Sequence, residues 1–214
     1  EERNLRYGEN PHQEASFYGD INKILKQLHG KQTSYNNLLD IDSAINLINE
    51  FNKPTFAVLK HNNPCGVATN KVLKKAWEKA LAGDPVSAFG GVIITNSKIN
   101  FETAKEIDKL FVEVLIAKDF DKKALEVLKS KKNRIILVQK ENTQSNQVLR
   151  SCLNGILVQD KDLKTDKKND LKYVTKKSPL PNEIEDLLFA SKICKHTKSN
   201  TIVLAKNKQL IGSG

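Results

Sequence analysis

The sequence predicts a layered α/β fold, because short apolar runs alternate with segments of helical periodicity along most of its 214 residues. Apolar runs typical of buried strands lie at 55–59, 92–95, 114–117 and 135–138. Segments with apolar residues three or four positions apart lie between these runs. A β-α-β-α-β series of this kind is typical of helices packed against one sheet.

The helices are predicted from apolar spacing and from signals at their ends. The strongest apolar stripe follows the polar residue Ser34 and consists of Ile41, Ala44, Ile45 and Ile48. Further helices are predicted over 21–29, 73–81, 101–111, 121–130 and 182–195.

Two irregular segments interrupt this pattern. Residues 3–19 contain Gly and Pro with little periodicity, which favours an extended arm. Residues 139–178 are polar and lysine-rich, with strand-like runs at 155–159 and 171–175. We expect a connector made of an edge hairpin and exposed loops there.

The last part of the chain repeats an order seen earlier. From 179 to 214 a helix, a short polar connection and an apolar strand at 201–205 follow one another, as they do over 41–66. We therefore expect residues 1–178 to form an arm and a first unit, and 179–214 to begin a second copy of that unit. The chain has no Met and ends in a Gly-rich turn at 212–214, so we expect it to be a fragment of a longer protein.

The net charge of +10 comes from 35 Lys and Arg against 25 Asp and Glu. This balance admits nucleic acid, a phosphorylated small molecule or a folate-like polyanion as a partner. The excess is mostly Lys spread along the chain, without the interleaved aromatic residues with which single-strand binders stack bases. A solvated lysine-rich surface is therefore favoured, and a nucleic-acid-binding module is kept as the alternative.

Cysteine usage and hydropathy bear on the compartment. The three cysteines are odd in number and far apart, which favours a reducing compartment over a disulfide framework. Without an apolar run long enough for a bilayer, and without a signal or transit peptide at the N-terminus, a membrane partner is not expected. We predict a cytosolic protein.

The stretch from Lys60 to Gly66, Lys-His-Asn-Asn-Pro-Cys-Gly, is the best candidate for chemistry. It follows the apolar run 55–59, so Lys60 and His61 are expected where a core strand passes into a tight loop. A neighbouring ammonium disfavours an imidazolium, so His61 should be neutral at pH 7 and able to accept a proton. Lys60 can stabilise a developing negative charge. A solvated strand-end lysine and a histidine bonded to backbone explain these residues equally well.

Three further positions are candidates for ligand contact. Arg6 beside Tyr7 combines a guanidinium suited to phosphate with an aromatic face suited to a heterocycle. An ordinary surface arginine next to a half-buried tyrosine would give the same sequence. Gly90 and Gly91 at a strand start allow close approach to the backbone, or only turn the chain. Glu113 precedes the strand 114–117 and suits a ligand amine or hydroxyl, or is a solvated strand-end charge.

Several chemistries are excluded or weak. A zinc deaminase needs His-x-Glu and Pro-Cys-x-x-Cys, whereas Pro64-Cys65 lacks the second thiol, so zinc is not expected. No phosphate-binding loop, dinucleotide fingerprint or nucleophile elbow is present. Cys65 is interpreted as a small buried residue in preference to a nucleophile.

Five motifs taken together are highly specific. They are Leu-Arg-Tyr-Gly-Glu-Asn-Pro-His-Gln at 5–13, Ser-Tyr-Asn-Asn-Leu-Leu-Asp at 34–40, the stretch 60–66, Asp-Pro-Val-Ser-Ala-Phe-Gly-Gly at 84–91 and Lys-His-Thr-Lys-Ser-Asn at 195–200. In order and spacing the chain resembles, over essentially its whole length, the AICAR transformylase domain of the bacterial bifunctional purine biosynthesis (PurH) family.

The resemblance implies a cytidine-deaminase-like three-layer α/β/α sandwich, duplicated in the family and used without zinc, with the second copy truncated here. It implies formyl transfer from 10-formyltetrahydrofolate, the co-substrate, to the 5-amino group of AICAR ribonucleotide by a homodimer. His61 matches the family's proton acceptor and Lys60 the residue that stabilises the transition state. The nucleotide contacts match Arg6, Tyr7, Gly90, Glu113 and Asn200.

The chain also departs from the family pattern. Leu153-Asn154-Gly155 stands where a Ser-Gly-Gly-like turn is usual, and we expect a local loop difference only. The family sequence continues beyond Gly214 as Gly-x-Gly-x-Gly-Gln into much of the folate site, and its IMP cyclohydrolase domain is not in this chain. We therefore expect this chain alone to be inactive, although intact Lys60 and His61 argue against a catalytically silent dimer scaffold.

Overall fold

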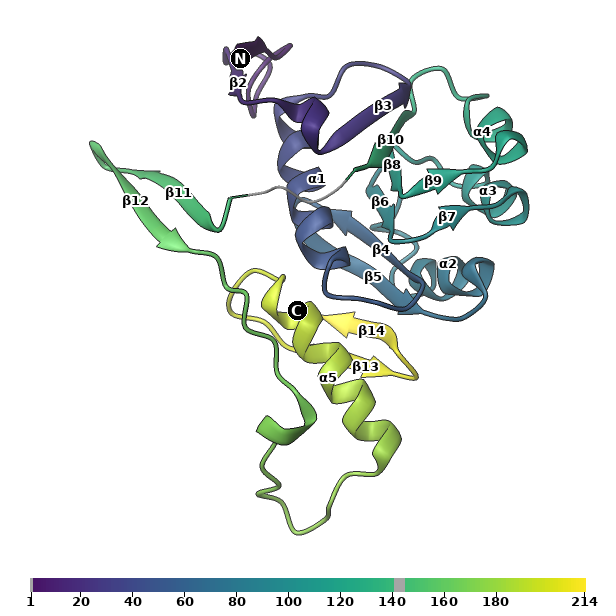
Figure 1. The fold of residues 1–214 in the computed structure, drawn as a ribbon, viewed down its shortest axis with the longest axis vertical. Helices are drawn as coiled ribbons and strands as arrows, with labels where there is room; N and C mark the ends of the chain where they lie inside the picture. Colours follow the sequence, from purple (N-terminus) through teal and green to yellow (C-terminus); the bar gives the residue numbers. More distant parts are fainter. Residues whose placement is uncertain (1, 141–144) are drawn as a thin grey trace.

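A mixed eight-stranded sheet forms the centre of the computed structural model, which describes residues 2–140 and 145–214 (Figure 1). Its strand order is β13-β14-β5-β4-β6-β8-β10-β3. The strands are β3 (Leu25–His29), β4 (Thr55–Lys60), β5 (Asn63–Thr69), β6 (Val92–Thr95), β8 (Val114–Ala117), β10 (Ile135–Gln139), β13 (Val203–Lys206) and β14 (Gln209–Ser213). Strands β6, β8 and β10 run parallel to one another, and the remaining neighbours in this sheet pair antiparallel.

Helices cover both faces of this sheet. They are α1 (Tyr35–Ile48), α2 (Leu73–Leu81), α3 (Phe101–Asp108), α4 (Lys122–Leu128) and α5 (Pro181–Lys195). Apolar side chains of α1 and α5 belong to one core, and those of α2, α3 and α4 belong to a second core on the opposite face. The predicted α/β class is therefore confirmed, whereas the cytidine-deaminase-like assignment and the duplication stay predictions.

Strand β4 shows why the apolar run at 55–60 is a central strand. Its side chains alternate between the two cores: Ala57 and Leu59 join the α1 side, while Phe56 and Val58 join the α2 side. All four are fully buried. A strand covered on both faces has no solvent side, so its sequence is a continuous apolar run.

Helix α1 begins at a capping box. The Ser34 hydroxyl accepts a hydrogen bond from the Asn37 N–H at 3.2 Å, and the Asn37 side chain accepts one from the Ser34 N–H at 3.1 Å. The stripe predicted from Ile41 to Ile48 is buried against the sheet. The cap and the stripe together fix α1 on the sheet, and its first turns reach the candidate site described below.

Smaller elements surround this body. They are β1 (Glu2–Asn4), β2 (Ser16–Tyr18), β7 (Lys98–Ile99), β9 (Asp119–Phe120), β11 (Gln147–Cys152), β12 (Gly155–Asp160) and the 3₁₀ helices η1 (Ile21–Lys23) and η2 (Lys168–Asp170). The pair β11–β12 is a separate two-stranded sheet that projects from the body (Figure 1), so the predicted hairpin is not at an edge of the main sheet. Residues 141–144 of the predicted connector lie outside the described residues.

Two sequence-based assignments of secondary structure were wrong. The helix predicted over 21–29 is the short η1 followed by strand β3, which pairs antiparallel with β10. Its apolar spacing suited a helix, but pairing with β10 supplies the backbone hydrogen bonds and outweighs that local preference. The run 171–175 is not a strand, and none of the described strands pairs with it.

The C-terminal segment extends the main sheet. Strand β14 lies where a terminal Gly-rich turn was expected, and it pairs with β5 at Gln209 and Ala68. Helix α5 packs on the α1 side, with the ring centroids of Phe189 and Phe51 5.4 Å apart. A boundary between two units near residue 179 stays a prediction. None of the helices in residues 2–140 and 145–214 has the length and apolar composition needed to cross a membrane.

Candidate active site

The Lys60–Gly66 stretch is a β-hairpin instead of the predicted loop. Strand β4 ends at Lys60, which pairs with Asn63, and β5 starts immediately after a two-residue turn. The turn residues His61 and Asn62 both have positive φ angles, of 50° and 66°, as type I′ turns require. This tight turn places the exposed imidazole of His61 at the tip of a central hairpin.

Sheet topology brings Lys60, Gly90 and Glu113 together where three neighbouring central strands end or begin. Because β4 is antiparallel to β6, its last residues lie beside the first residue of β6, with Leu59 opposite Val92. Val92 in turn lies opposite Val114, where the parallel strand β8 begins. The candidate site therefore lies at the amino ends of the parallel strands, whereas the carboxyl ends are the usual ligand edge of open parallel sheets.

Lys60 contacts the loop that precedes β6. Its Nζ donates a hydrogen bond to the Phe89 carbonyl at 2.9 Å. Gly90 has a φ of +67°, and a Cβ at that position would lie 3.4 Å from the Lys60 Nζ and 3.3 Å from the Phe111 ring. Glycine at 90 therefore keeps the backbone open beside the ammonium, as the candidate role in ligand contact requires.

Glu113 is a paired carboxylate and not a solvated strand-end charge. Its Oε1 lies 2.8 Å from the Nζ of Lys31, and both side chains are about one-third exposed. The backbone of Glu113 joins two neighbouring segments, since its N–H donates to the Gly91 carbonyl and its carbonyl accepts from the Ile135 N–H. A ligand amine or hydroxyl at this position would compete with Lys31 for the carboxylate.

Asp40 joins this cluster although sequence reasoning assigned it no role. Its Oδ1 accepts a hydrogen bond from the Asn62 N–H at 2.6 Å, across 22 positions of sequence. Burial raises the pKa of Asp40 above its ordinary value. The bond from Asn62 and the charges of His61 and Lys60 offset only part of this effect. Asp40 closes the Ser-Tyr-Asn-Asn-Leu-Leu-Asp motif, and that motif was the available signal.

The N-terminal arm docks on the same face of α1. The Asn36 side chain donates to the Glu9 carbonyl at 3.1 Å, and Asn36 lies one helical turn before Asp40. Within the arm, the Arg6 guanidinium lies 5.4 Å from the centroid of the Tyr7 ring. The arm and the hairpin turn are thus bonded to neighbouring turns of one helix, and Arg6 remains exposed.

The segment that carries Asn200 also reaches the hairpin. The Lys198 N–H donates to the Asn63 side chain at 3.0 Å, one residue after the turn. Asn200 itself is exposed, two residues further along the chain. The structure therefore brings the hairpin, the Gly90 loop, Glu113 and the 198–200 segment into one region of the molecule.

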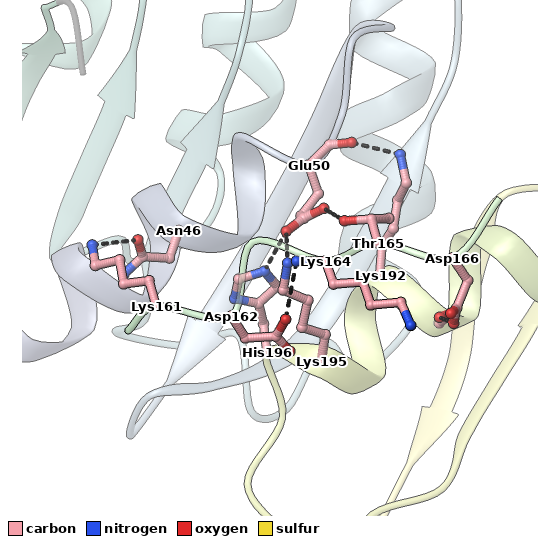
Figure 2. A network of polar contacts seen from close by, with 11 residues as sticks. Asn46, Glu50, Lys161, Asp162, Lys164, Thr165, Asp166, Lys192, Lys195 and His196 are labelled. Carbon is pink, nitrogen blue, oxygen red and sulfur yellow. Dashed lines mark hydrogen bonds and ion pairs between the residues drawn. The ribbon is translucent and has the colours of Figure 1, made fainter. Parts of the chain in front are cut away.

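A polar network around Glu50 anchors the helix that leads into this segment (Figure 2). Glu50 Oε1 lies 2.8 Å from Lys195 Nζ and 3.0 Å from His196 Nε2. Its Oε2 accepts a bond from the Thr165 hydroxyl at 2.7 Å, and its backbone carbonyl accepts one from Lys192 at 2.6 Å. Sequence reasoning missed this network, because its members come from the end of α1, the connector and α5.

Burial and hydrogen bonding shift two groups of this network. Burial lowers the pKa of His196 below its ordinary value, despite the opposing effect of Glu50. Burial raises the pKa of Glu50, but hydrogen bonds from Lys195, His196 and Thr165 outweigh it and leave the pKa below its ordinary value. At pH 7 the network therefore holds a carboxylate, an ammonium and a neutral imidazole that donates to Glu50.

This network predicts a loss of stability in acid. The folded protein holds His196 neutral, whereas the unfolded chain protonates it near its ordinary pKa of 6.5. The stability that the neutral His196 contributes to the folded protein is therefore present above pH 6.5 and is lost as the pH falls below 6.5. The stability that the ionised Glu50 contributes is lost below about pH 4.5. We expect the Tm to be lower at pH 5.5 than at pH 7.5, and expect His196→Gln to reduce this difference. His12→Gln, on an exposed arm residue, is the control, and an unchanged difference in His196→Gln would contradict the assignment.

Cys65 is not suited to nucleophilic chemistry. Burial, and then the charge of Asp84, raise the pKa of its thiol to about 11. The thiol lies 3.5 Å from the Val58 carbonyl within the hairpin. A protonated, half-buried thiol supports its interpretation as a packing residue.

Comparison with known sequences defines the class of protein. A sequence model of the family described as "AICARFT/IMPCHase bienzyme" matches residues 1–214. The chain therefore belongs to this family of bifunctional purine biosynthesis proteins, and the predicted resemblance is confirmed.

Individual relatives match all or nearly all of the chain. It is 58% identical over 213 residues to the bifunctional purine biosynthesis protein PurH of Bacteroides thetaiotaomicron, covering 100% of this chain and 42% of that protein. It is 48% identical over 220 residues to PurH of Caldicellulosiruptor saccharolyticus, covering 98% of this chain and 43% of that protein. The corresponding values for PurH of Persephonella marina are 46% over 220 residues, 98% and 42%. The chain thus spans less than half the length of these curated relatives.

Proposed function

We propose that the chain contributes the formyl-transfer site of a purine biosynthesis enzyme, which moves the formyl group of 10-formyltetrahydrofolate to the 5-amino group of AICAR ribonucleotide. The observation that carries the proposal is the hairpin at 60–66. It carries Lys60 and the exposed His61 at consecutive positions where the central strand β4 ends, and the Lys60 ammonium lies next to the open backbone of Gly90. Family membership supports the same reaction.

The chemistry needs a base and a cation. The 5-amino nitrogen attacks the formyl carbon, and His61 accepts the proton that the nitrogen loses as the new C–N bond forms. Lys60 stabilises the negative charge that develops on the formyl oxygen. The bond from the formyl carbon to the folate nitrogen then breaks, a proton reaches that nitrogen, and formylated AICAR ribonucleotide and tetrahydrofolate result. No metal takes part in this scheme.

The nucleotide is proposed to lie between the arm and the hairpin. Arg6 suits the phosphate and Tyr7 the heterocycle. Gly90, Glu113 and Asn200 complete the contacts at the sheet edge. Much of the folate contact is proposed to come from residues beyond 214, and the proposed location of the enzyme is the cytosol.

A homodimer is part of the proposal. Hairpin β11–β12 exposes six apolar side chains, at Val148, Leu149, Leu153, Ile156, Leu157 and Val158. Exposed apolar patches of this kind are typical of protein interaction sites. A second subunit packed against this hairpin accounts for these residues.

Nucleotide binding and turnover by the full-length protein test the proposed function. Formyl transfer is followed as tetrahydrofolate release in the presence of AICAR ribonucleotide. Nucleotide affinity is measured by calorimetry for the wild type and for Arg6→Ala, which should raise the Kd about tenfold or more because a charged phosphate contact is lost. Arg3→Ala, on the neighbouring arginine of the arm, is the control. A wild-type protein that binds the nucleotide without transferring the formyl group would contradict the proposed reaction, and an unchanged Kd in Arg6→Ala would contradict the proposed phosphate contact.

A further inference from the structure

The hairpin turn that carries His61 has an unfavourable backbone. His61 and Asn62 have φ angles of 50° and 66°, in the left-handed region that favours glycine. Such conformations persist where surrounding contacts hold them, and they are frequent at functional sites. The contacts that hold this turn therefore also set where the imidazole of His61 lies.

The shortest contact to the turn comes from Asp40. Its carboxylate accepts the Asn62 N–H at 2.6 Å, a charge-assisted bond from a half-buried side chain. Ser43, three residues further along α1, contacts the Asn62 side chain at 3.4 Å. Because α1 is capped at Ser34 and packed on the sheet, it is a rigid platform for this bond.

Charge adds a second effect. Asp40 interacts electrostatically with His61 and Lys60 on the hairpin and with Glu113 at the start of β8. Glu113 is already paired with Lys31, at 2.8 Å. In the proposed reaction His61 becomes positive when it accepts the substrate proton, and the carboxylate of Asp40, bonded to the N–H of the next residue, Asn62, favours that form.

We propose that Asp40 is a positioning residue for His61, which fixes the turn through the Asn62 N–H and stabilises the imidazolium formed during transfer. The inference rests on the proposed function. It goes beyond it by giving a role to a residue of α1 that acts through the hairpin without touching the substrate.

Two substitutions in the full-length protein separate the two effects. Asp40→Ala removes both the acceptor and the charge, and should lower kcat about tenfold to a hundredfold, since a small misplacement of a catalytic group has effects of this size. The Kd for AICAR ribonucleotide should change less than about twofold, because no nucleotide contact is lost. Asp40→Asn keeps an oxygen acceptor, so it should recover part of kcat. Its loss of charge should move the acid limb of the kcat profile to lower pH.

Asp42→Ala is the matched control, since Asp42 is an exposed carboxylate on α1 that accepts a bond from Asn46. Unchanged kcat in Asp40→Ala would overturn the proposal. An acid limb of Asp40→Asn that coincides with the wild type would overturn the electrostatic part of it.

Amide hydrogen exchange keeps this test separate from the proposed function. Exchange of the Asn62 N–H should be faster in Asp40→Ala than in the wild type and in Asp42→Ala. If the wild-type protein transfers no formyl group, the proposed function fails, while faster exchange still supports the hold of Asp40 on the turn. Equal exchange in all three proteins would overturn that hold whatever reaction the enzyme performs.

Discussion

Replacing His61 by alanine in the full-length protein should lower kcat for formyl transfer about 10²- to 10⁴-fold, the usual contribution of a positioned general base. The Kd for AICAR ribonucleotide should stay close to the wild-type value, because His61 lies exposed at the tip of the hairpin and the proposed phosphate contact is Arg6. A large loss of kcat without a change in Kd is the signature of a group that acts only in the transition state. Single-turnover kinetics together with calorimetry measures both quantities.

His29→Gln provides the control for this variant. His29 lies on the edge strand β3, and its ring contacts the Lys131 carbonyl at 3.2 Å. This substitution should leave both kcat and Kd unchanged. If His61→Ala retained wild-type kcat, another group would have to accept the proton, and the mechanism proposed here would be wrong.

Gly66→Ala should strongly destabilise the fold. A Cβ at this position would lie 2.0 Å from the Ala80 carbonyl oxygen and 3.0 Å from its carbon. These atoms belong to the backbone of α2, so strand and helix must move apart to admit one methyl group. We expect the free energy of unfolding to fall by about 3 kcal/mol or more, the upper range for an overpacked core. For a domain of this size that corresponds to a Tm lower by roughly 6–12 °C.

Gly212→Ala is the control, because a Cβ at Gly212 meets no atom of residues 2–140 and 145–214 within 4 Å. Thermal unfolding followed by circular dichroism, on the same full-length protein, compares the two variants. Equal Tm values would mean that α2 can shift without cost, contrary to the close approach of β5 and α2.

The main elements of the fold were predictable wherever local pattern and tertiary position agreed. Strand β4 is buried on both faces, so its apolar run was sufficient to identify it. Helix α1 was predicted from its apolar stripe, and the structure adds a capping box at its first turn. Strands β6, β8 and β10 were identified in the same way.

Prediction failed where long-range pairing overrides local chemistry. Strand β5 contains Asn63, Pro64 and Gly66, residues typical of a loop, yet pairing with β4 makes it a strand. Strand β3 has helical apolar spacing, yet it completes the sheet beside β10. The hydrogen bonds that decide these segments come from partners that a local window of sequence does not contain.

The candidate site divides in the same way. Lys60 and His61 were identified from sequence because a basic pair directly follows a buried strand. Asp40 and Glu50 were missed, because a lone carboxylate on a helix or just after one carries no local signal of its partners. Asp40 is 22 positions from Asn62, and Glu50 is 145 positions from Lys195.

By itself, therefore, the sequence determined the α/β class, the family and the basic pair, since each depends on residues close together or on motifs in a fixed order. The tertiary structure decided three other features. They are the turn that carries His61, the end of the sheet strands at which this turn lies, and the two carboxylates, Asp40 bonded to the turn and Glu50 bonded to the helix that leads to Asn200. These depend on the antiparallel pairing of β4 with β6 and on the packing of α1 and α5. Such pairing and packing join residues that are far apart in the sequence. Their contacts, and the free energy that these contribute, form only when the chain folds.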